Sequence, residues 1–333
     1  MNKQRIVYLD VIRVIACMMV TIMHAPIPGT TAESHGAFLT LISYLTIPCV
    51  PLFIMISGTL LLPCRKEIKA IDYLKKRIGK VAVPTIIFSL FYMFINKSTN
   101  WPISILSIPF STQGPGIFWF MHTLIGLYLL VPIISPWIRQ TSKRELEIYL
   151  LLWMVTQCYP YLSLFLEINS SNTGILYYFT GYAGYFLLGY YLNRYPISLR
   201  WLLPLAILML PLPLFNKVFH WNLDFYSVFW YLSAPVVIMT VAWFVGIKRL
   251  CETFVLNIRI SRISDLSFGI YLIHIFIIYI LLWNWSVIKE IPNYYLQTVV
   301  VALLTFVGSY IVCRIISYMP YSQYLIGYTE RNK

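Results

Sequence analysis

Apolar residues recur along the whole chain in runs of roughly 20, separated by shorter stretches that hold most of the charged side chains. A run of this length is enough for a helix to cross a hydrocarbon core about 30 Å thick. We expect about ten such helices. Their bounds are approximately 6–25, 38–63, 81–96, 117–138, 146–164, 174–192, 201–215, 225–247, 267–288 and 296–318. The pattern predicts an all-α polytopic membrane protein.

The composition agrees with this interpretation, because 59% of the residues are hydrophobic and only 11% are charged. No polar stretch is long enough to fold separately, so we expect a single transmembrane domain over residues 1–333. The formal charge of +13 could indicate a nucleic-acid partner, but its distribution along the chain indicates membrane orientation instead. The histidines and cysteines have no metal-type spacing, and we expect no metal.

The positions of the basic residues predict how the chain is oriented in the membrane. With the N-terminus in the cytoplasm, only Lys97, Lys217 and Lys289 fall in the expected outer loops. Arg13 falls inside the first span, and Arg314 lies near the inner end of the last one. All other Lys and Arg residues lie on the inner side. This satisfies the positive-inside rule and predicts that both termini are cytoplasmic.

The first apolar run carries Asp10, Arg13 and His24. A charge inside a span costs roughly 2.5–3.5 kcal/mol on insertion scales, so such residues are commonly functional. Asp10 and Arg13 are three residues apart and can pair on one helix face, although they could also only anchor the helix at the inner interface. His24 follows Arg13 by eleven residues, which returns it to nearly the same face about 16 Å further along. Asp10, Arg13 and His24 are therefore expected to lie along one face of the helix.

The sequence after His24 predicts the end of this helix. Pro26 and Pro28 cannot continue it, and the last carbonyl groups then need partners. An imidazole at this position can exchange protons near neutral pH, as a general base must. Asp10 is about 21 Å away along the helix, so we expect the group that orients His24 to come from another helix.

Four motifs along the chain carry a resemblance to a known family. They are Arg13 and His24 in the first run, VPLFIMISGTL at 50–60 with Ser57, FWFMHTL at 118–124 with GLYLLVP at 126–132, and SFGIYLIH at 267–274. In this order they resemble the acyltransferase 3 family, the integral-membrane O-acyltransferases of bacterial envelopes. The resemblance covers the whole chain.

The resemblance implies transfer of an acyl group, usually acetyl, from cytoplasmic acyl-CoA to a hydroxyl of an envelope polysaccharide or lipid-linked glycan. It also implies a bacterial inner-membrane location, acyl-CoA as a substrate and no permanently bound cofactor. His24 would act as a general base or relay the acyl group. Arg13 would hold the donor together with Asp10, and Arg259 and Arg262 offer further cations that could equally be simple anchors.

Four more residues are candidates to line the site. Ser57 could contact substrate or only bond the preceding helical turn, and Trp119 could line the site or anchor the span at the interface. His274 matches the family motif but could orient helices through hydrogen bonds. His122 departs from the family pattern, in which this position is more often aromatic or aliphatic.

Two other functions are compatible with the charged residues. One is a transporter or flippase for a lipid-linked glycan that uses Asp10, Arg13, His24, His122 and His274 as relay or substrate residues. The other is a non-catalytic membrane partner in polysaccharide export. The four motifs and the lack of similarity between the two halves of the chain favour the acyltransferase. The acceptor, the acyl group, an acyl-histidine intermediate and a homodimer stay open.

Overall fold

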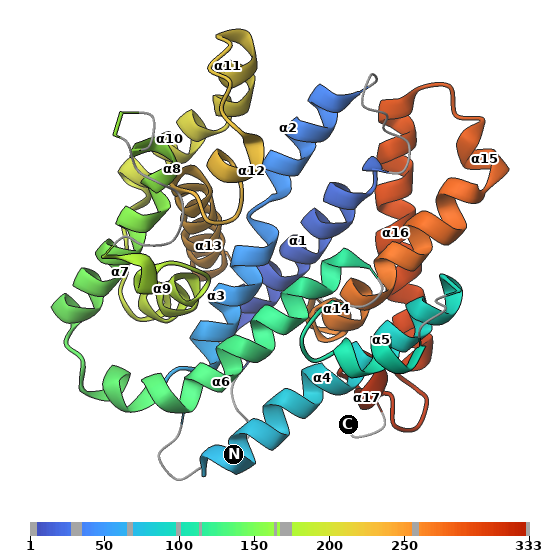
Figure 1. Cartoon of the computed structure of the whole chain (residues 1–333), viewed down its shortest axis with the longest axis horizontal. Helices are drawn as coiled ribbons and strands as arrows, with labels where there is room; N and C mark the ends of the chain where they lie inside the picture. Colours follow the sequence, from blue (N-terminus) through green and yellow to red (C-terminus); the bar gives the residue numbers. More distant parts are fainter. Residues whose placement is uncertain are drawn as a thin grey trace. The chain divides into compact units, whose positions relative to one another are not determined.

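The computed structural model describes residues 5–27, 35–64, 69–97, 101–112, 115–162, 165–166, 175–254 and 260–330. These residues form helices and loops without any β strand (Figure 1), which confirms the prediction of an all-α polytopic membrane protein. The chain divides into two compact units, Met1–Leu62 with Ile138–Ser261 and Pro63–Trp137 with Arg262–Lys333. We call them unit 1 and unit 2 and describe each by itself. The single domain over 1–333 stays a prediction.

Unit 1 contains the first helix and the helices that pack against it. Its elements are α1 (Val7–His24), α2 (Gly36–Thr46), α3 (Cys49–Leu61), α7 (Lys143–Gln157), α8 (Tyr159–Leu162), η3 (Tyr177–Phe179), α9 (Ala183–Arg194), α10 (Leu199–Met209), α11 (Leu212–Val218), α12 (Phe225–Val228) and α13 (Ala234–Thr253).

Unit 2 contains the other long helices. Its elements are α4 (Ala70–Ile95), α5 (Trp101–Ser107), η2 (Gly116–Phe118), most of α6 (Trp119–Gln140), most of α14 (Ile260–Ile275), the π-helical η4 (Phe276–Leu281), η5 (Leu282–Asn284), α15 (Ser286–Lys289), α16 (Tyr294–Ile316) and α17 (Gln323–Ile326).

Within the described residues, eight helical stretches are long and apolar enough to cross a membrane. They are Val7–His24, Gly36–Leu61, Ala70–Ile95, Gly116–Gln140, Leu199–Val218, Ala234–Thr253, Ile260–Asn284 and Tyr294–Ile316. The expected spans 146–164 and 174–192 correspond to α7 and α9, which have only 15 and 12 residues. The total of ten spans stays a prediction.

Several expected spans are interrupted helices, and proline accounts for the breaks. Pro48 is the N-cap of α3 and separates it from α2, while Pro211 separates α10 from α11 in the same way. Pro235 lies in the first turn of α13, after the short α12. Proline has no backbone N–H and fixes its φ angle, so it suits the start of a helix and ends the one before it.

Helices α3 and α9 approach closely because each contributes a glycine at the contact. A Cβ atom at Gly58 would lie 1.8 Å from the carbonyl oxygen of Phe186. One at Gly189 would lie 2.1 Å from the carbonyl oxygen of Met55. The Thr59 hydroxyl also donates to the Gly189 carbonyl across the same contact, at 2.8 Å. Small residues at helix contacts in membranes permit this packing. From the sequence, the three glycines of the expected span 174–192, which are Gly181, Gly184 and Gly189, are all predicted to permit such contacts.

The other two glycines expected to permit helix contact differ from each other. Gly184 fulfils the expectation, because an added Cβ would lie 2.1 Å from the Trp153 ring. Gly181 does not, since nothing lies within 4 Å of its Cβ position and its φ of +94° places it in the left-handed region. Its role is the backbone turn before α9, and this turn explains why the helix begins at Ala183 rather than near 174.

Candidate active site

Helix α1 is held along one buried face. Leu9, Ile12, Ala16, Val20 and Met23 are all nearly inaccessible, and their spacing of three or four residues is typical of one side of a helix. This face packs against α2, α3 and α13 within unit 1. The helix begins after the extended residue Ile6 and ends at His24, so the predicted end before Pro26 is confirmed.

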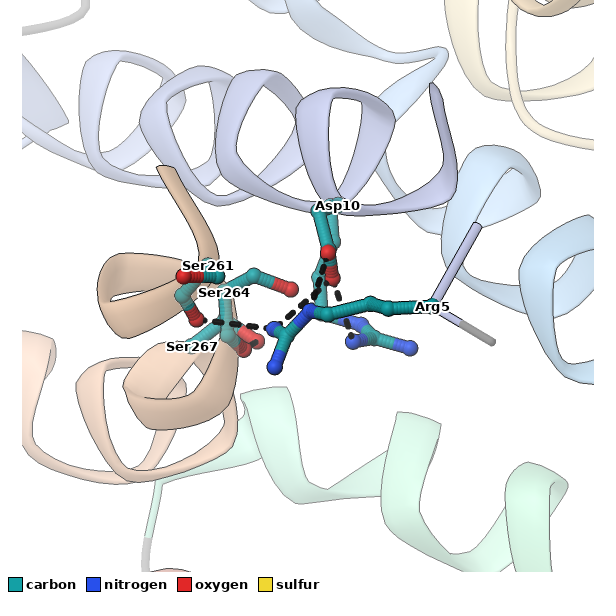
Figure 2. Close-up of polar contacts among 6 residues, drawn as sticks. Arg5, Asp10, Ser261, Ser264 and Ser267 are labelled. Atoms are coloured by element: carbon teal, nitrogen blue, oxygen red, sulfur yellow. Dashed lines mark hydrogen bonds and ion pairs between the residues drawn. The ribbon is translucent and has the colours of Figure 1, made fainter. Parts of the chain in front are cut away.

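The first half of α1 holds a buried carboxylate between two guanidinium groups. Asp10 is only 6% exposed. Arg13 lies one turn further along, with Nη1 at 3.6 Å from Oδ1, which confirms the predicted pair. Arg5 forms a second ion pair with the same carboxylate, and its Nη2 donates to Oδ1 at 3.1 Å (Figure 2). A buried carboxylate requires such partners, because desolvation alone would strongly destabilise its charged form.

Arg5 also connects α1 to the start of α14. Its Nη2 donates to the Ser261 carbonyl at 2.8 Å, and Figure 2 shows the guanidinium between Asp10 and this carbonyl. From the sequence, Arg5 is expected only to be one of the cations on the inner side of the membrane. A spacing of five residues is not a helical pairing distance, and Arg5 reaches Asp10 only because it precedes the helix. With one carboxylate and two guanidiniums, the cluster carries a net charge of about +1.

The second half of α1 ends at His24. His24 is half-buried, and its Nδ1–H donates to the Val20 carbonyl of the same helix at 2.9 Å. A carbonyl oxygen only accepts, so this bond requires the proton on Nδ1 and leaves the lone pair of the neutral ring on Nε2. The prediction that another helix orients the ring was therefore wrong for Nδ1. The Val20 carbonyl lies one turn before His24 in the same helix, so the imidazole folds back along α1.

Met23, the residue before His24, contacts the segment that leads into α13. The Tyr231 hydroxyl lies 3.9 Å from the Met23 sulfur. Tyr231 is itself fixed, because its carbonyl accepts the Tyr185 hydroxyl at 2.6 Å. The segment that leads into α13 therefore forms part of the surroundings of the His24 end of α1.

At the opposite end of α1, a lysine closes the end of a neighbouring helix. Lys248 on α13 donates to the carbonyl groups of Leu192 and Asn193, at 3.0 and 2.9 Å. The Tyr8 hydroxyl donates to the Asn193 side-chain oxygen. Lys248, which is expected on the inner side, therefore holds the end of α9, as cations at helix C-termini commonly do.

Ser57 lies on α3, which packs against α1. Its hydroxyl donates to the Phe53 carbonyl of its own helix at 3.0 Å. This is the bond to the preceding turn that sequence reasoning gave as the structural alternative. Contact between Ser57 and a substrate stays a prediction.

Trp119 and His122 lie together at the start of α6 in unit 2, and both are half-buried. The Trp119 ring packs edge-on against Phe120. His122 has Nδ1 at 3.0 Å from the Phe118 carbonyl and Nε2 at 2.7 Å from the Ile108 carbonyl. Its ring therefore joins the start of α6 to the segment after α5.

His274 lies on α14 and is fully buried, with Nδ1 donating to the Tyr271 carbonyl at 2.6 Å. The Tyr271 hydroxyl donates to the Ile117 carbonyl at 2.6 Å, which connects α14 to the segment before α6. The third and fourth motifs therefore meet in unit 2. Arg262 is exposed in the first turn of α14, and Arg259 lies outside the described residues.

Comparison with known proteins identifies one family. A sequence model of the acyltransferase 3 family, described as an acyltransferase domain, matches residues 6–317. The match extends from the start of α1 to the end of α16 and includes all four motifs. A comparison with curated proteins returned no match, and neither did one with solved structures.

Proposed function

Because the chain belongs to the acyltransferase 3 family, we propose that this membrane acyltransferase moves an acetyl group from cytoplasmic acetyl-CoA to a hydroxyl of an envelope glycan. The family match supports acyl transfer to a glycan-type acceptor. The donor, the acyl group and the residues that act are parts of the proposal. We propose the bacterial inner membrane as its location, and a kinship with the enterobacterial common antigen O-acetyltransferase.

The central element of the proposal is Nε2 of His24 as the general base. The observation that supports it is the bond from Nδ1 to the Val20 carbonyl, because this bond places the ring's lone pair on Nε2. Nε2 would remove the proton from the acceptor hydroxyl while its oxygen attacks the thioester carbonyl. The tetrahedral oxyanion would then collapse, form the new ester and expel the CoA thiolate. The thiolate would take up the proton, so the products are the acetylated glycan and CoA.

Nε2 is also the atom that would act in an acyl relay. In that version it attacks the thioester, CoA leaves, and the acetyl group then passes from the imidazole to the acceptor oxygen. Rapid quenching separates the two versions. A relay produces protein that carries an acetyl group on His24, detectable in the intact mass, when acetyl-CoA is supplied without acceptor.

The cluster at the other end of α1 would hold the donor. A guanidinium suits the geometry of phosphate groups, and the net positive charge around Asp10 favours an anionic ligand. Arg5 keeps Asp10 paired. Arg13 could therefore turn toward the donor without leaving the carboxylate alone. About 16 Å of helix separates Arg13 from His24, a span that the pantetheine arm of CoA could follow.

The test is transfer by the purified full-length protein in lipid nanodiscs. Wild-type protein with radiolabelled acetyl-CoA and deacetylated envelope glycan should move the label to the glycan, whereas His24→Ala protein should not. A label that stays on CoA in both cases would mean that the proposed reaction is wrong.

A further inference from the structure

Helix α4 of unit 2 begins with a group of cations that the proposed acetyl transfer does not use. Lys69 is the N-cap of the helix, and Lys75, Lys76, Arg77 and Lys80 follow in its first three turns. The four lysines are exposed, and Arg77 is half-buried. Among the described residues, no carboxylate forms an ion pair with any of these side chains. By the predicted topology, this end of α4 lies on the inner side of the membrane.

Three of the lysines share one face of the helix. Lys76 and Lys80 are four residues apart and Lys69 precedes Lys76 by seven, so all three lie within about 40° of one another. We call this the lysine face. Like charges four residues apart destabilise a helix, and the exposed Asp72 on the same side forms no ion pair with the lysines. The described residues therefore leave the positive charge of this face without a partner.

The lysine face continues along α4 as exposed apolar surface. Val83 and Phe94 follow Lys76 by seven and eighteen residues, which returns both to within about 20° of it. Val83 is 36% exposed and Phe94 is 73% exposed, whereas Thr85 on the opposite side is only 3% exposed. The helix rises about 27 Å from Lys76 to Phe94, more than the roughly 15 Å hydrocarbon depth of one leaflet. One face therefore carries cations at its inner end and apolar side chains at membrane depth.

A face of this kind fits a molecule with an anionic head and hydrocarbon chains. The lysines suit a phosphate at the depth of the lipid head groups, and the residues from Val83 onward suit acyl chains. A zwitterionic phospholipid fits less well, because its own cation lies beside its phosphate. CoA also carries phosphates, but its polar nucleotide would lie against the exposed apolar part of the face without hydrogen-bond partners there.

We propose that the lysine face of α4 binds an anionic phospholipid of the inner leaflet. The phosphate lies between Lys76 and Lys80, and the acyl chains extend along the helix toward Phe94. The lipid reduces the repulsion between the two lysines, so it stabilises the first turns of α4. The inference concerns a surface of unit 2 and does not depend on the proposed acetyl transfer.

The first test measures lipid binding to the full-length protein by native mass spectrometry. Wild-type protein should bind phosphatidylglycerol more tightly than phosphatidylcholine. Lys76→Gln/Lys80→Gln should weaken phosphatidylglycerol binding by about twentyfold, because each lysine near an anionic lipid contributes roughly a factor of five. Lys76→Arg/Lys80→Arg keeps both charges and should bind within about threefold of wild type.

A charge-matched control separates a site on this face from general attraction between the protein and anionic lipid. Lys75→Gln/Arg144→Gln removes the same charge from two exposed residues of the expected inner side that do not belong to the lysine face. It should leave phosphatidylglycerol binding within about threefold of wild type. A loss as large as that of Lys76→Gln/Lys80→Gln would overturn the inference, and so would unchanged binding in the latter variant.

Thermal unfolding gives a second measurement that tolerates a variant of lower stability. Wild-type protein should unfold at a higher temperature in phosphatidylglycerol nanodiscs than in phosphatidylcholine nanodiscs, because a ligand of the folded state stabilises it. Lys76→Gln/Lys80→Gln should lose most of this difference, even if it unfolds earlier in both lipids. A difference as large as that of wild type would contradict the site.

Binding of CoA in phosphatidylcholine nanodiscs tests the other anionic occupant. Wild-type protein and Lys76→Gln/Lys80→Gln should retain radiolabelled CoA equally well. A variant that loses CoA but keeps phosphatidylglycerol would overturn the inference and assign the lysines to the donor. These readouts do not involve acetyl transfer, so a protein that transfers no acetyl group leaves their outcome unchanged.

Discussion

Two histidines at helix ends form the same hydrogen bond, from a ring nitrogen to the carbonyl one turn earlier in the helix. His24 on α1 and His122 on α6 each have Nδ1 close to the carbonyl four residues earlier, at 2.9 and 3.0 Å. His122 also has Nε2 at 2.7 Å from the Ile108 carbonyl, so carbonyl groups from two segments hold its ring. The bond from Nδ1 of His24 requires that the lone pair of the neutral ring is on Nε2.

The comparison shows that an imidazole in a membrane helix is not by itself a catalytic group. A ring with carbonyl groups at both nitrogens joins two segments, and it can offer a lone pair to a substrate only if one of these contacts is lost. A ring with one carbonyl at Nδ1 has a defined tautomer and a basic Nε2. The following predictions test this difference.

The largest expected effect is on the reaction itself. His24→Ala should lower the rate of acetyl transfer by about 10²–10⁴-fold, because general-base catalysis contributes roughly that factor. The measurement is the initial rate with radiolabelled acetyl-CoA. The matched control is His122→Ala, which should keep its rate within about threefold of wild type, since the proposed role of His122 is not chemical. Equal losses in both variants would contradict the distinction.

The next effect concerns donor binding at the other end of α1. Arg13→Gln should raise KM for acetyl-CoA about tenfold, because a charge-assisted bond to phosphate is lost. Arg5→Gln should lower thermal stability more than it changes this KM, since Arg5 holds Asp10 and the Ser261 carbonyl. Michaelis curves and unfolding temperatures are measured for both variants. If Arg5→Gln shifted KM as much as Arg13→Gln does, the donor assignment would move to the whole cluster.

A smaller effect is expected on stability at α6. His122→Phe keeps a ring of similar shape but removes the two nitrogens that face the Phe118 and Ile108 carbonyl groups. The free energy of unfolding should fall by about 1–3 kcal/mol. Thermal unfolding in detergent with His24→Phe as the comparison variant checks this, because the bond from Nδ1 of His24 stays within its own helix. A stability loss for His24→Phe as large as that for His122→Phe would argue against the role of His122 in joining the start of α6 to the segment after α5.

The smallest effect is expected at Tyr271, which connects α14 to the same part of unit 2. Tyr271→Phe removes only the hydroxyl that donates to the Ile117 carbonyl at 2.6 Å. Unfolding should become easier by about 1 kcal/mol, and acetyl transfer should stay near the wild-type rate. A large loss of transfer without a loss of stability would give Tyr271 a chemical role.

Much of the first helix could be predicted from the residues alone. Spacing rules placed Asp10 and Arg13 on one face, and the prolines predicted the end after His24. Spans interrupted by Pro48 and Pro211 could be predicted less well, because a long apolar run does not show where it is divided. The prediction for Gly181 was wrong for a similar reason. The residue type alone does not distinguish a glycine at a close helix contact from a glycine with a left-handed backbone.

By itself, the sequence determined the all-α membrane class, the family and the charged stripe on α1, because length, hydropathy and helical spacing are local properties. The tertiary structure decided how Arg5 reaches Asp10 and which atoms of His24 and His122 are engaged. It also decided that residues remote in the chain, between Tyr161 and Ile238, line one apolar pocket. These outcomes depend on which carbonyl or side chain lies within about 3 Å of a given atom, and that distance is set by packing between segments remote in the chain.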